Sequence, residues 1–313
     1  MASDATGNFV VAWMSGGQDG SSWGVFGQRF NAAGLPQGSE FRVNSFTTSN
    51  QRRPAVASDA NGNFVVVWQS GGQDESAYGV FGQRFSAAGL PQGSEFQVNS
   101  YTTDYQYGPS VASDANGNFV VVWTSNGQDG SDEGVFGQRF NASGVPQGTE
   151  FRVNSYTPGY QISPSVASDA NGNFVVVWQS YQDGGYGVFG QRFSASGLPL
   201  GGEFQVDSYA AVAQRVPSVA SDANGNFVVA WASNGQDGSA FGVFGQRFNA
   251  GGLPQGAEFQ VNSYTTNRQY LPVVASAANG NFVVAWSSYG QDGSGYGIFG
   301  QRYGDLIFKN GFE

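Results

Sequence analysis

The sequence predicts an all-β protein, a six-bladed β-propeller with four antiparallel strands in each blade. Three observations lead to this fold class. The chain contains six near-identical repeats with a period of about 55 residues. Each repeat has four short β-like runs separated by glycine-rich turns, and no segment has the periodicity and caps of a helix. One tryptophan sets the register of each repeat: Trp13, Trp68, Trp123, Trp178, Trp231 and Trp286.

We expect one propeller domain over residues 1–303, because a single repeat cannot bury both of its faces. A β-solenoid is the main alternative, although its rungs are usually shorter. The first repeat lacks most of its first strand and the last lacks its fourth, so residues 304–313 are a candidate for the missing closing strand. The repeats span approximately residues 1–53, 54–108, 109–163, 164–216, 217–271 and 272–303.

The third repeat shows the elements in order. Pro109–Asp114 is the expected first strand, and an Asn-Gly pair after it is a strong hairpin signal. Asn118–Ser125 is apolar and β-branched, as in a strand buried on both faces. Val135–Phe140 and Thr149–Asn154 are the expected third and fourth strands. Strand alternation then puts the two tight turns at one end of the blade and the longer polar loops at the other.

Composition excludes several classes of function. The net charge of -10 and the pI of about 4.4 disfavour nucleic acid and anionic membrane surfaces as partners. No apolar run is long enough to insert into a membrane. The absence of cysteine and histidine excludes disulfides, a Ser-His-Asp triad and ordinary zinc sites.

A Gln-Asp pair recurs in the longer loop of every repeat. It has three interpretations: bonding of backbone amides that holds the loop, binding of a sugar by planar polar groups beside an aromatic ring, and binding of calcium. Calcium is the only cofactor considered, and its ligands would be Asp19, Asp74, Asp129, Asp183, Asp237 and Asp292. The candidate ligand-binding set comprises Gln18, Asp19, Gln73, Asp74, Gln128, Asp129, Gln182, Asp183, Gln236, Asp237, Gln291 and Asp292, with Trp23, Tyr78, Tyr186 and Tyr296 from the same loops.

Other repeated residues have structural interpretations. We expect the tryptophans to be core residues and the aspartates before the Asn-Gly turns to cap those turns. We expect the recurring glutamines of the inter-blade loops to satisfy backbone groups, and the third-strand arginines to pair with the turn aspartate or with a strand glutamate. These sets are Asp4, Asp59, Asp114, Asp169 and Asp222; Gln51, Gln106, Gln161, Gln214 and Gln269; and Arg29, Arg84, Arg139, Arg192, Arg247 and Arg302.

The motif W-x-S-x-G-Q-D-G-S-x-x-G-[VI]-F-G-Q-R, best seen from Trp286 to Tyr303, resembles tandem repeats of large secreted bacterial proteins of the adhesin and hemolysin type that bind calcium. The segment Ile307–Glu313 looks like a C-terminal tag of secreted Gram-negative proteins. The resemblance implies a secreted, extracellular protein and no defined activity.

We therefore expect a non-catalytic binding module and not an enzyme, which recognises a glycan or a cell-surface protein through several weak sites. A scaffold domain without a ligand is the alternative, and a glycoside-acting enzyme ranks third because near-identical blades do not provide one special site. The inter-blade loops vary most and would form an asymmetric site if one exists. Its residues would be Arg52, Arg53, Tyr105, Tyr107, Tyr160, Arg215, Arg268 and Tyr270.

Overall fold

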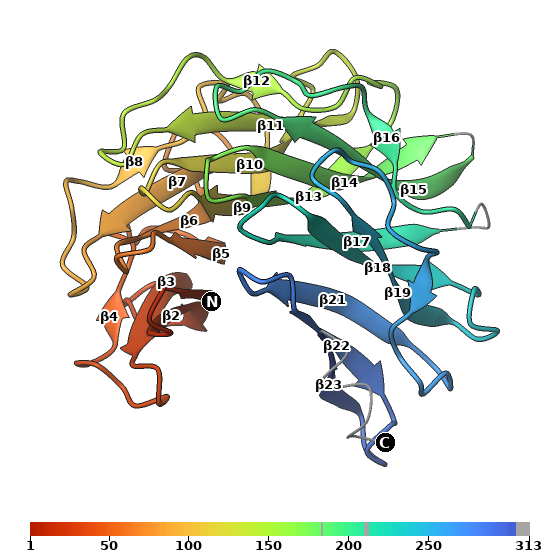
Figure 1. Cartoon of the computed structure of the whole chain (residues 1–313). Helices are drawn as coiled ribbons and strands as arrows, with labels where there is room; N and C mark the ends of the chain where they lie inside the picture. Colours follow the sequence, from red (N-terminus) through yellow and green to blue (C-terminus); the bar gives the residue numbers. More distant parts are fainter. Residues whose placement is uncertain (183, 210–212, 305–313) are drawn as a thin grey trace. The chain divides into compact units, whose positions relative to one another are not determined.

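The computed structural model describes residues 1–182, 184–209 and 213–304 (Figure 1). These residues form strands and turns, and the fold is the predicted all-β six-bladed β-propeller. None of them belongs to a helix that could cross a membrane. The proposed closing strand at the C-terminus lies outside the described residues from position 305 onward. The chain packs as two compact units, Met1–Pro164 and Ser165–Glu313.

The first unit contains blades 1 to 3, each a sheet whose strands are in sequence order. Blade 1 consists of β1 (Ala2–Ser3), β2 (Phe9–Gly16), β3 (Trp23–Phe30) and β4 (Phe41–Arg42). Blade 2 consists of β5 (Gln51–Ser58), β6 (Phe64–Gly71), β7 (Tyr78–Phe85) and β8 (Phe96–Gln97). Blade 3 consists of β9 (Gln106–Ser113), β10 (Phe119–Asn126), β11 (Glu133–Phe140) and β12 (Phe151–Arg152).

The second unit contains blades 4 to 6, although the first strand of blade 4 begins before the boundary. Blade 4 consists of β13 (Gln161–Ser168), β14 (Phe174–Gln182), β15 (Gly185–Phe193) and β16 (Phe204–Gln205). Blade 5 consists of β17 (Gln214–Ser221), β18 (Phe227–Asn234), β19 (Phe241–Phe248) and β20 (Phe259–Gln260). Blade 6 has three described strands, β21 (Gln269–Ser276), β22 (Phe282–Tyr289) and β23 (Tyr296–Tyr303).

The second strand of each blade carries the core, as its apolar run predicts. Every residue of β6 is buried, and Trp68 and Trp123 have no exposed surface. Trp123 packs in one cluster with Val67 and Val80 of the preceding blade, so the core forms between blades. Burial of one large apolar side chain stabilises a fold by about 1.5–3 kcal/mol, which makes this interface the main source of stability. The prediction that the tryptophans are core residues is confirmed for Trp68, Trp123, Trp178, Trp231 and Trp286, whereas Trp13 in the first blade is partly exposed.

The first strand begins earlier than the sequence pattern indicates, at Gln106 instead of Pro109. A proline cannot donate a ladder hydrogen bond, which is why it looks like a strand boundary. Here the pairing of β9 with β10 shifts register between Val122 and Thr124, and Gly108 takes a positive φ of 61°. The resulting bulge accommodates the proline and lets the strand continue.

The tight turns behave as predicted. The Asp59 carboxylate accepts hydrogen bonds from the amides of Asn61 at 2.9 Å and Asn63 at 2.8 Å, so it caps the Asn-Gly hairpin. The third strand has a glycine because the fourth strand's phenylalanine lies over it. A Cβ on Gly82 would meet the Phe96 ring at 2.8 Å.

Candidate functional site

The Gln-Asp loops are held from within the blade. The Asp19 carboxylate accepts a hydrogen bond from the Ser21 amide at 3.1 Å and from the Asn44 side chain at 3.3 Å. Asn44 is 2% exposed, and its oxygen accepts a hydrogen bond from the Val25 amide at 2.7 Å. The aspartate therefore joins the loop to the third strand through a buried asparagine.

A glycine at the start of the third strand makes room for this aspartate. A Cβ on Gly24 would lie 2.5 Å from the Asp19 carboxylate. The aspartates of blades 2, 3, 5 and 6 make the same close approach to Gly79, Gly134, Gly242 and Gly297. These carboxylates point into the blade, as the loop-holding interpretation predicts. Among the residues that the structure describes, no three acidic side chains gather into a group that could hold a metal ion.

The glutamine of the pair is also hydrogen-bonded within the blade in blades 1, 2, 3 and 5. Gln73 donates a hydrogen bond to Glu95, whose other oxygen accepts from the amide of Ser45, in the preceding blade, at 2.6 Å. Gln18, Gln128 and Gln236 make the corresponding bond to Glu40, Glu150 and Glu258. Glu95, Glu150 and Glu258 thus link neighbouring blades, and their bonds in the described part of the chain go to serine and glutamine instead of arginine.

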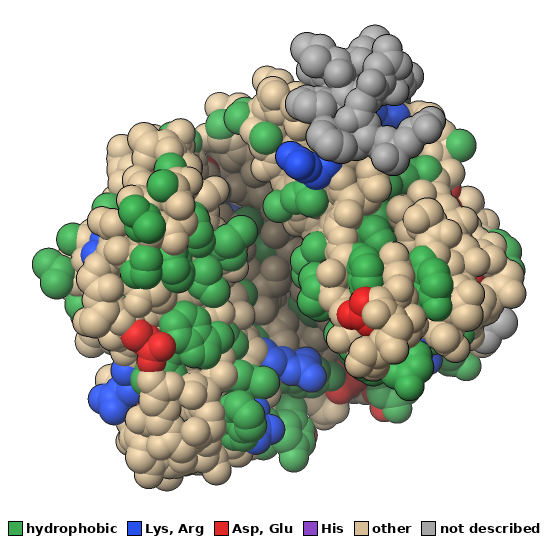
Figure 2. Space-filling view, turned by 90° about the horizontal axis from the view of Figure 1, so that it is seen from below, with side chains coloured by type: hydrophobic (Ala, Val, Ile, Leu, Met, Phe, Trp, Pro, Cys, Tyr) green, Lys and Arg blue, Asp and Glu red, His purple; other side chains and the backbone are tan. Residues whose placement is uncertain are grey.

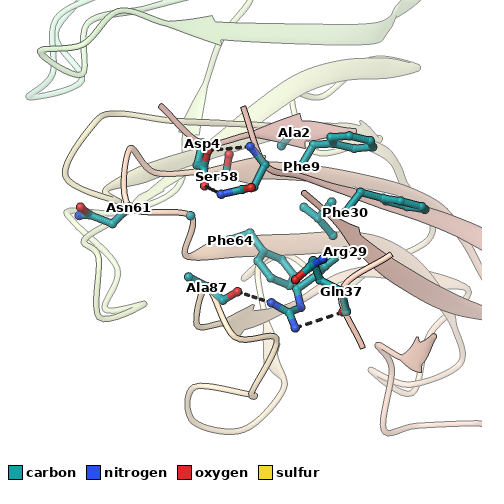
Figure 3. A pocket seen from close by; sticks show the side chains of 13 residues that line it. Ala2, Asp4, Phe9, Arg29, Phe30, Gln37, Ser58, Asn61, Phe64 and Ala87 are labelled. Atoms are coloured by element: carbon teal, nitrogen blue, oxygen red, sulfur yellow. Dashed lines mark hydrogen bonds between the residues drawn. The ribbon is translucent and has the colours of Figure 1, made fainter. Parts of the chain in front are cut away.

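The third-strand arginines also differ from the expected ion pairs. Arg29 donates to the carbonyl oxygen of Ala87 in the next blade at 2.6 Å and to that of Gln37 at 3.2 Å. Together with Asp4 and Ser58, Arg29 lines a cavity of about 230 Å³ between blades 1 and 2 (Figure 3). The Asp4 carboxylate there accepts hydrogen bonds from Thr6 and Asn8, so it stabilises the turn that follows it in the chain.

Blade 4 departs from this pattern. Asp207 replaces the buried asparagine and is 5% exposed. Burial raises the pKa of its carboxyl group to about 6, although the hydrogen bonds from the Val188 amide and from Gln205 act in the opposite direction and lower it. Gln182 donates to the hydroxyl oxygen of Ser180 at 3.0 Å, and Asp183 lies outside the described residues.

The predicted aromatic residues stand where the third strand begins. The Arg52 guanidinium lies 5.3 Å from the centre of the Trp23 ring. Tyr78 packs against Tyr105 with ring centres 6.1 Å apart, and Tyr105 is 49% exposed. In the second unit, the ring centres of Tyr186 and Tyr181 are 5.1 Å apart, and those of Tyr296 and Tyr289 are 5.0 Å apart. These rings lie near the variable loops, whereas the aspartates of the Gln-Asp pairs in blades 1, 2, 3, 5 and 6 point into the blades.

Blade 3 has an acid at this aromatic position. Glu133 stands where the other blades have Trp23, Tyr78, Tyr186, Phe241 and Tyr296. The Tyr107 hydroxyl donates a hydrogen bond of 2.6 Å to a carboxylate oxygen of Glu133. Tyr160, which is 43% exposed, forms a bridge with Glu133 along the backbone. A hydrogen-bonded phenol and carboxylate therefore occur beside an exposed ring in one blade.

An arginine side chain lies over the residue that follows Tyr107. A Cβ on Gly108 would be 3.6 Å from a guanidinium nitrogen of Arg53. Arg53 has a positive φ of 52°, which is uncommon for a residue other than glycine. The Gly108 amide donates to Gln69 at 3.1 Å, which fixes the bulge in the first strand of blade 3.

Sequence reasoning named Tyr107 and Arg53 among the variable loops but did not connect them with Glu133. The signal was present, because the Asp-Glu-Gly sequence of the third repeat breaks the aromatic position. It also missed the buried asparagines and Gln69, because their partners come from other strands. The surface in Figure 2 consists mostly of uncharged polar and apolar side chains, with few charged groups scattered among them.

No protein-family model and no curated protein matches the sequence. Solved structures share the fold. A protein of unknown function from Dyadobacter fermentans has a TM-score of 0.67 at 11% identity, over 96% of this chain and 92% of that chain. An α-L-arabinanase from Penicillium chrysogenum, solved with arabinobiose, has a TM-score of 0.56 at 12% identity, over 94% and 93%. An ulvan lyase, a polysaccharide lyase, has a TM-score of 0.57 at 12% identity, over 96% and 77%.

These comparisons correct the functional expectation from sequence. The prediction of a non-catalytic binding module that is not an enzyme is overturned, because the solved structures with this fold include an arabinanase and an ulvan lyase. The physical premise also fails, since blade 3 is not identical to the other blades: it has Glu133 where they have an aromatic residue.

Proposed function

We propose that this protein is a carbohydrate-processing enzyme that cleaves an acidic polysaccharide, with Tyr107 and Glu133 as its acid–base pair. The observation that carries the proposal is the 2.6 Å hydrogen bond between these side chains beside Arg53. An acid–base pair needs its two members within hydrogen-bond reach of each other or of the proton that moves. The ulvan lyase with this fold was solved with a segment that contains GlcA, an acidic sugar.

The charge of the site favours an acidic substrate. The chain has a net charge of -10, yet Arg52 and Arg53 are adjacent in one inter-blade loop. A guanidinium pairs well with a planar carboxylate, because its N–H groups form a fork that matches the two oxygens. Arg53 would bind the carboxylate of a uronic acid and neutralise the charge that develops when the neighbouring carbon loses its proton.

Elimination fits the residues better than hydrolysis. Glycoside hydrolysis uses two carboxylates, and the carboxylate in contact with Tyr107 is that of Glu133. In the elimination, Glu133 accepts the proton from C5 of the uronic acid and a double bond forms between C4 and C5. The C4–O bond breaks as Tyr107 gives its proton to the leaving oxygen. The proton on Glu133 then returns to Tyr107 through their hydrogen bond, which restores the starting state.

The exposed aromatic rings complete the site. Tyr105 and Tyr160 are about half exposed and flank the acid–base pair along the chain. Sugar rings stack on such faces, because each ring of a sugar has an apolar side. The two tyrosines would bind the sugars on either side of the cleaved bond.

The test compares Glu133→Gln with Asp132→Asn, a matched loss of one charge at the neighbouring exposed acid. Polygalacturonate, alginate and ulvan are supplied as substrates, and unsaturated product is followed by ultraviolet absorbance and reducing ends by a colour reaction. We expect Glu133→Gln to lower the rate by about 100- to 10,000-fold, as for other general acid–base groups, and Asp132→Asn to keep it.

Three results would count against this proposal. Reducing ends without ultraviolet absorbance would identify hydrolysis instead of elimination. Equal rates for Glu133→Gln and the unmodified protein would remove Glu133 from the mechanism. Absence of cleavage of all three polymers by the unmodified protein would reject the activity.

We also propose that the protein works outside the cell, as the resemblance to secreted bacterial repeats implies. Polysaccharides of this size do not enter cells intact, so the proposed substrate supports the same location. Immunodetection in the culture supernatant of the source organism tests it, and detection in the cytoplasm alone would reject it.

A further inference from the structure

Two arginines of the second unit are stacked on aromatic rings. The Arg268 guanidinium carbon lies 3.8 Å from the centre of the Tyr270 ring and 5.1 Å from that of Phe241. The Arg215 guanidinium carbon lies 5.0 Å from the centre of the Tyr186 ring. In both cases an arginine from one blade lies over a ring at the start of the third strand in the preceding blade. Stacking on a ring face attracts the cation and restricts where its N–H edge points.

Neither arginine is neutralised by the blades. Among the residues that the structure describes, the side chains of Arg215 and Arg268 have no hydrogen-bond or acidic partner, and the Nε–H of each is buried without an acceptor. A buried donor without a partner costs roughly 1–3 kcal/mol. Arg192, at the opposite end of its blade, instead donates to the Ala250 carbonyl oxygen at 2.8 Å. The contrast shows that these blades can satisfy an arginine. The buried Nε–H groups of Arg215 and Arg268 are closed to a ligand, but both side chains are partly exposed, so their terminal N–H groups remain as donors.

Exposed rings lie beside these cations. Tyr181 is 41% exposed and contacts Tyr186 at 5.1 Å, the ring under Arg215. Tyr270 contacts Phe241 with ring centres 5.0 Å apart, and Arg268 lies against both. A ligand could bind here through two groups at the same time: an anionic group on the guanidinium and a ring stacked on the tyrosine. An anionic sugar provides both groups on one residue of the polymer.

We propose that Arg215 and Arg268, with Tyr186 and Tyr270, form a second binding site that takes anionic sugar residues, as carboxylates or sulfate esters. This site has no acid–base pair, so it would hold the polymer and not cleave it. The choice of polymer rests on the proposed function, but the site itself rests on the unpaired arginines. Repeated contacts with one polymer strengthen its binding, because each further contact occurs at a high effective concentration.

The experiment measures binding without cleavage. Glu133→Gln in the full chain serves as the background, and the affinities for polygalacturonate, dextran sulfate and neutral dextran are measured by affinity electrophoresis. Arg268→Met is compared with Arg302→Met, an exposed arginine of the same unit. We expect Arg268→Met to weaken binding of an anionic polymer by about tenfold, equivalent to about 1.4 kcal/mol, and Arg302→Met to leave it unchanged.

Arg268→Lys provides a second variant that keeps the charge, and far-ultraviolet circular dichroism checks the fold of each variant. We expect it to bind more weakly than the unmodified protein, because an ammonium lacks the planar fork. An effect limited to polygalacturonate identifies carboxylates as the ligand, and one limited to dextran sulfate identifies sulfate esters. Equal weakening by Arg268→Met and Arg302→Met, or no weakening by either, would overturn the site.

Binding and cleavage can fail separately. If Glu133→Gln retains full activity while Arg268→Met loses binding, the proposed active site is wrong and the second site stands. If Glu133→Gln loses activity while Arg268→Met binds normally, the active site stands and the second site is wrong.

Discussion

Blades 3 and 4 each contain a carboxylate at a position where the other blades have an uncharged residue, and these two carboxylates are in opposite situations. Glu133 replaces an aromatic residue at the start of a third strand, where Tyr107 donates to it at 2.6 Å. Asp207 replaces a buried asparagine, and burial raises its pKa to about 6. The same chemical group is thus partly exposed in one blade and enclosed in the other. In a repeat protein, the position within the blade decides what an exceptional residue does.

The largest change in stability is expected when blade 3 is given an aspartate at the position of its buried asparagine, as blade 4 has at Asp207. Asn154→Asp would remove the side-chain donor and place a second carboxylate beside that of Asp129, which lies 3.4 Å from the Asn154 nitrogen. An uncompensated buried charge costs about 3–5 kcal/mol, and we expect this loss in the free energy of unfolding at pH 7. Urea denaturation measures it. Gln147→Glu, which adds a charge on the surface of the same blade, is the control, and an equal loss for both would contradict the buried network.

The reverse change should stabilise blade 4. Asp207 has a folded pKa of about 6 and an ordinary value of 3.8, so between these values only the folded chain keeps the proton. Stability contributed by this group is therefore lost as the pH rises from about 4 to about 6, and a two-unit shift corresponds to about 3 kcal/mol at most. We expect Asp207→Asn to raise the unfolding free energy at pH 7 by about 1–3 kcal/mol and to flatten this pH dependence. Urea titrations at pH 4.5 and 7 test it, and a variant that is less stable at pH 7 would refute the assignment.

Gly134 in blade 3 and Gly187 in blade 4 occupy equivalent positions, so substitutions there test how much space each blade leaves beside its loop. A Cβ on Gly134 would meet the Asp129 carboxylate at 2.6 Å, whereas a Cβ on Gly187 would meet Phe189 at 3.0 Å and Asp207 at 3.4 Å. Overpacking costs about 1–3 kcal/mol, so we expect Gly134→Ala to be more destabilising than Gly187→Ala. Thermal unfolding followed by circular dichroism ranks the two, and the opposite order would show that the aspartate moves away at little cost.

The smallest effect on stability is expected for Glu133→Tyr, which gives blade 3 the residue of blade 2. Glu133 is partly exposed, and changes at such positions usually alter the unfolding free energy by less than about 0.5 kcal/mol. We expect stability to persist and polysaccharide cleavage to be lost. A loss of both would assign Glu133 a structural role instead of a catalytic one.

Much of the fold is visible in single repeats. The Asn-Gly turns and their capping aspartates were predicted, because a hairpin of this kind is specified by a few consecutive residues. The buried tryptophans follow from the apolar run in which they occur. The start of the first strand was misplaced, because the bulge that accommodates Pro109 depends on its register with β10.

The candidate site was predicted less well. The aromatic residues and the variable loops were identified from their position and variation. The Gln-Asp pairs were included as candidates for binding, yet the structure turns them toward Asn44, Glu95 and their equivalents. The partner of Tyr107 is 26 residues away on another strand, and no local pattern connects the two.

The sequence alone therefore determined the repeat, the strand order within a blade, the turns and the identity of the core residues. These properties follow from hydrophobic alternation and turn chemistry over a few residues, so each repeat states them in full. The tertiary structure decided which polar side chains are hydrogen-bonded within the blades and which keep donors or acceptors without a partner among the described residues. That choice depends on strand register and on the neighbouring blade. Glu95 accepts a hydrogen bond from Ser45, 50 residues earlier, whereas Arg268 stacks on Phe241 and its Nε–H has no acceptor in the described part of the chain.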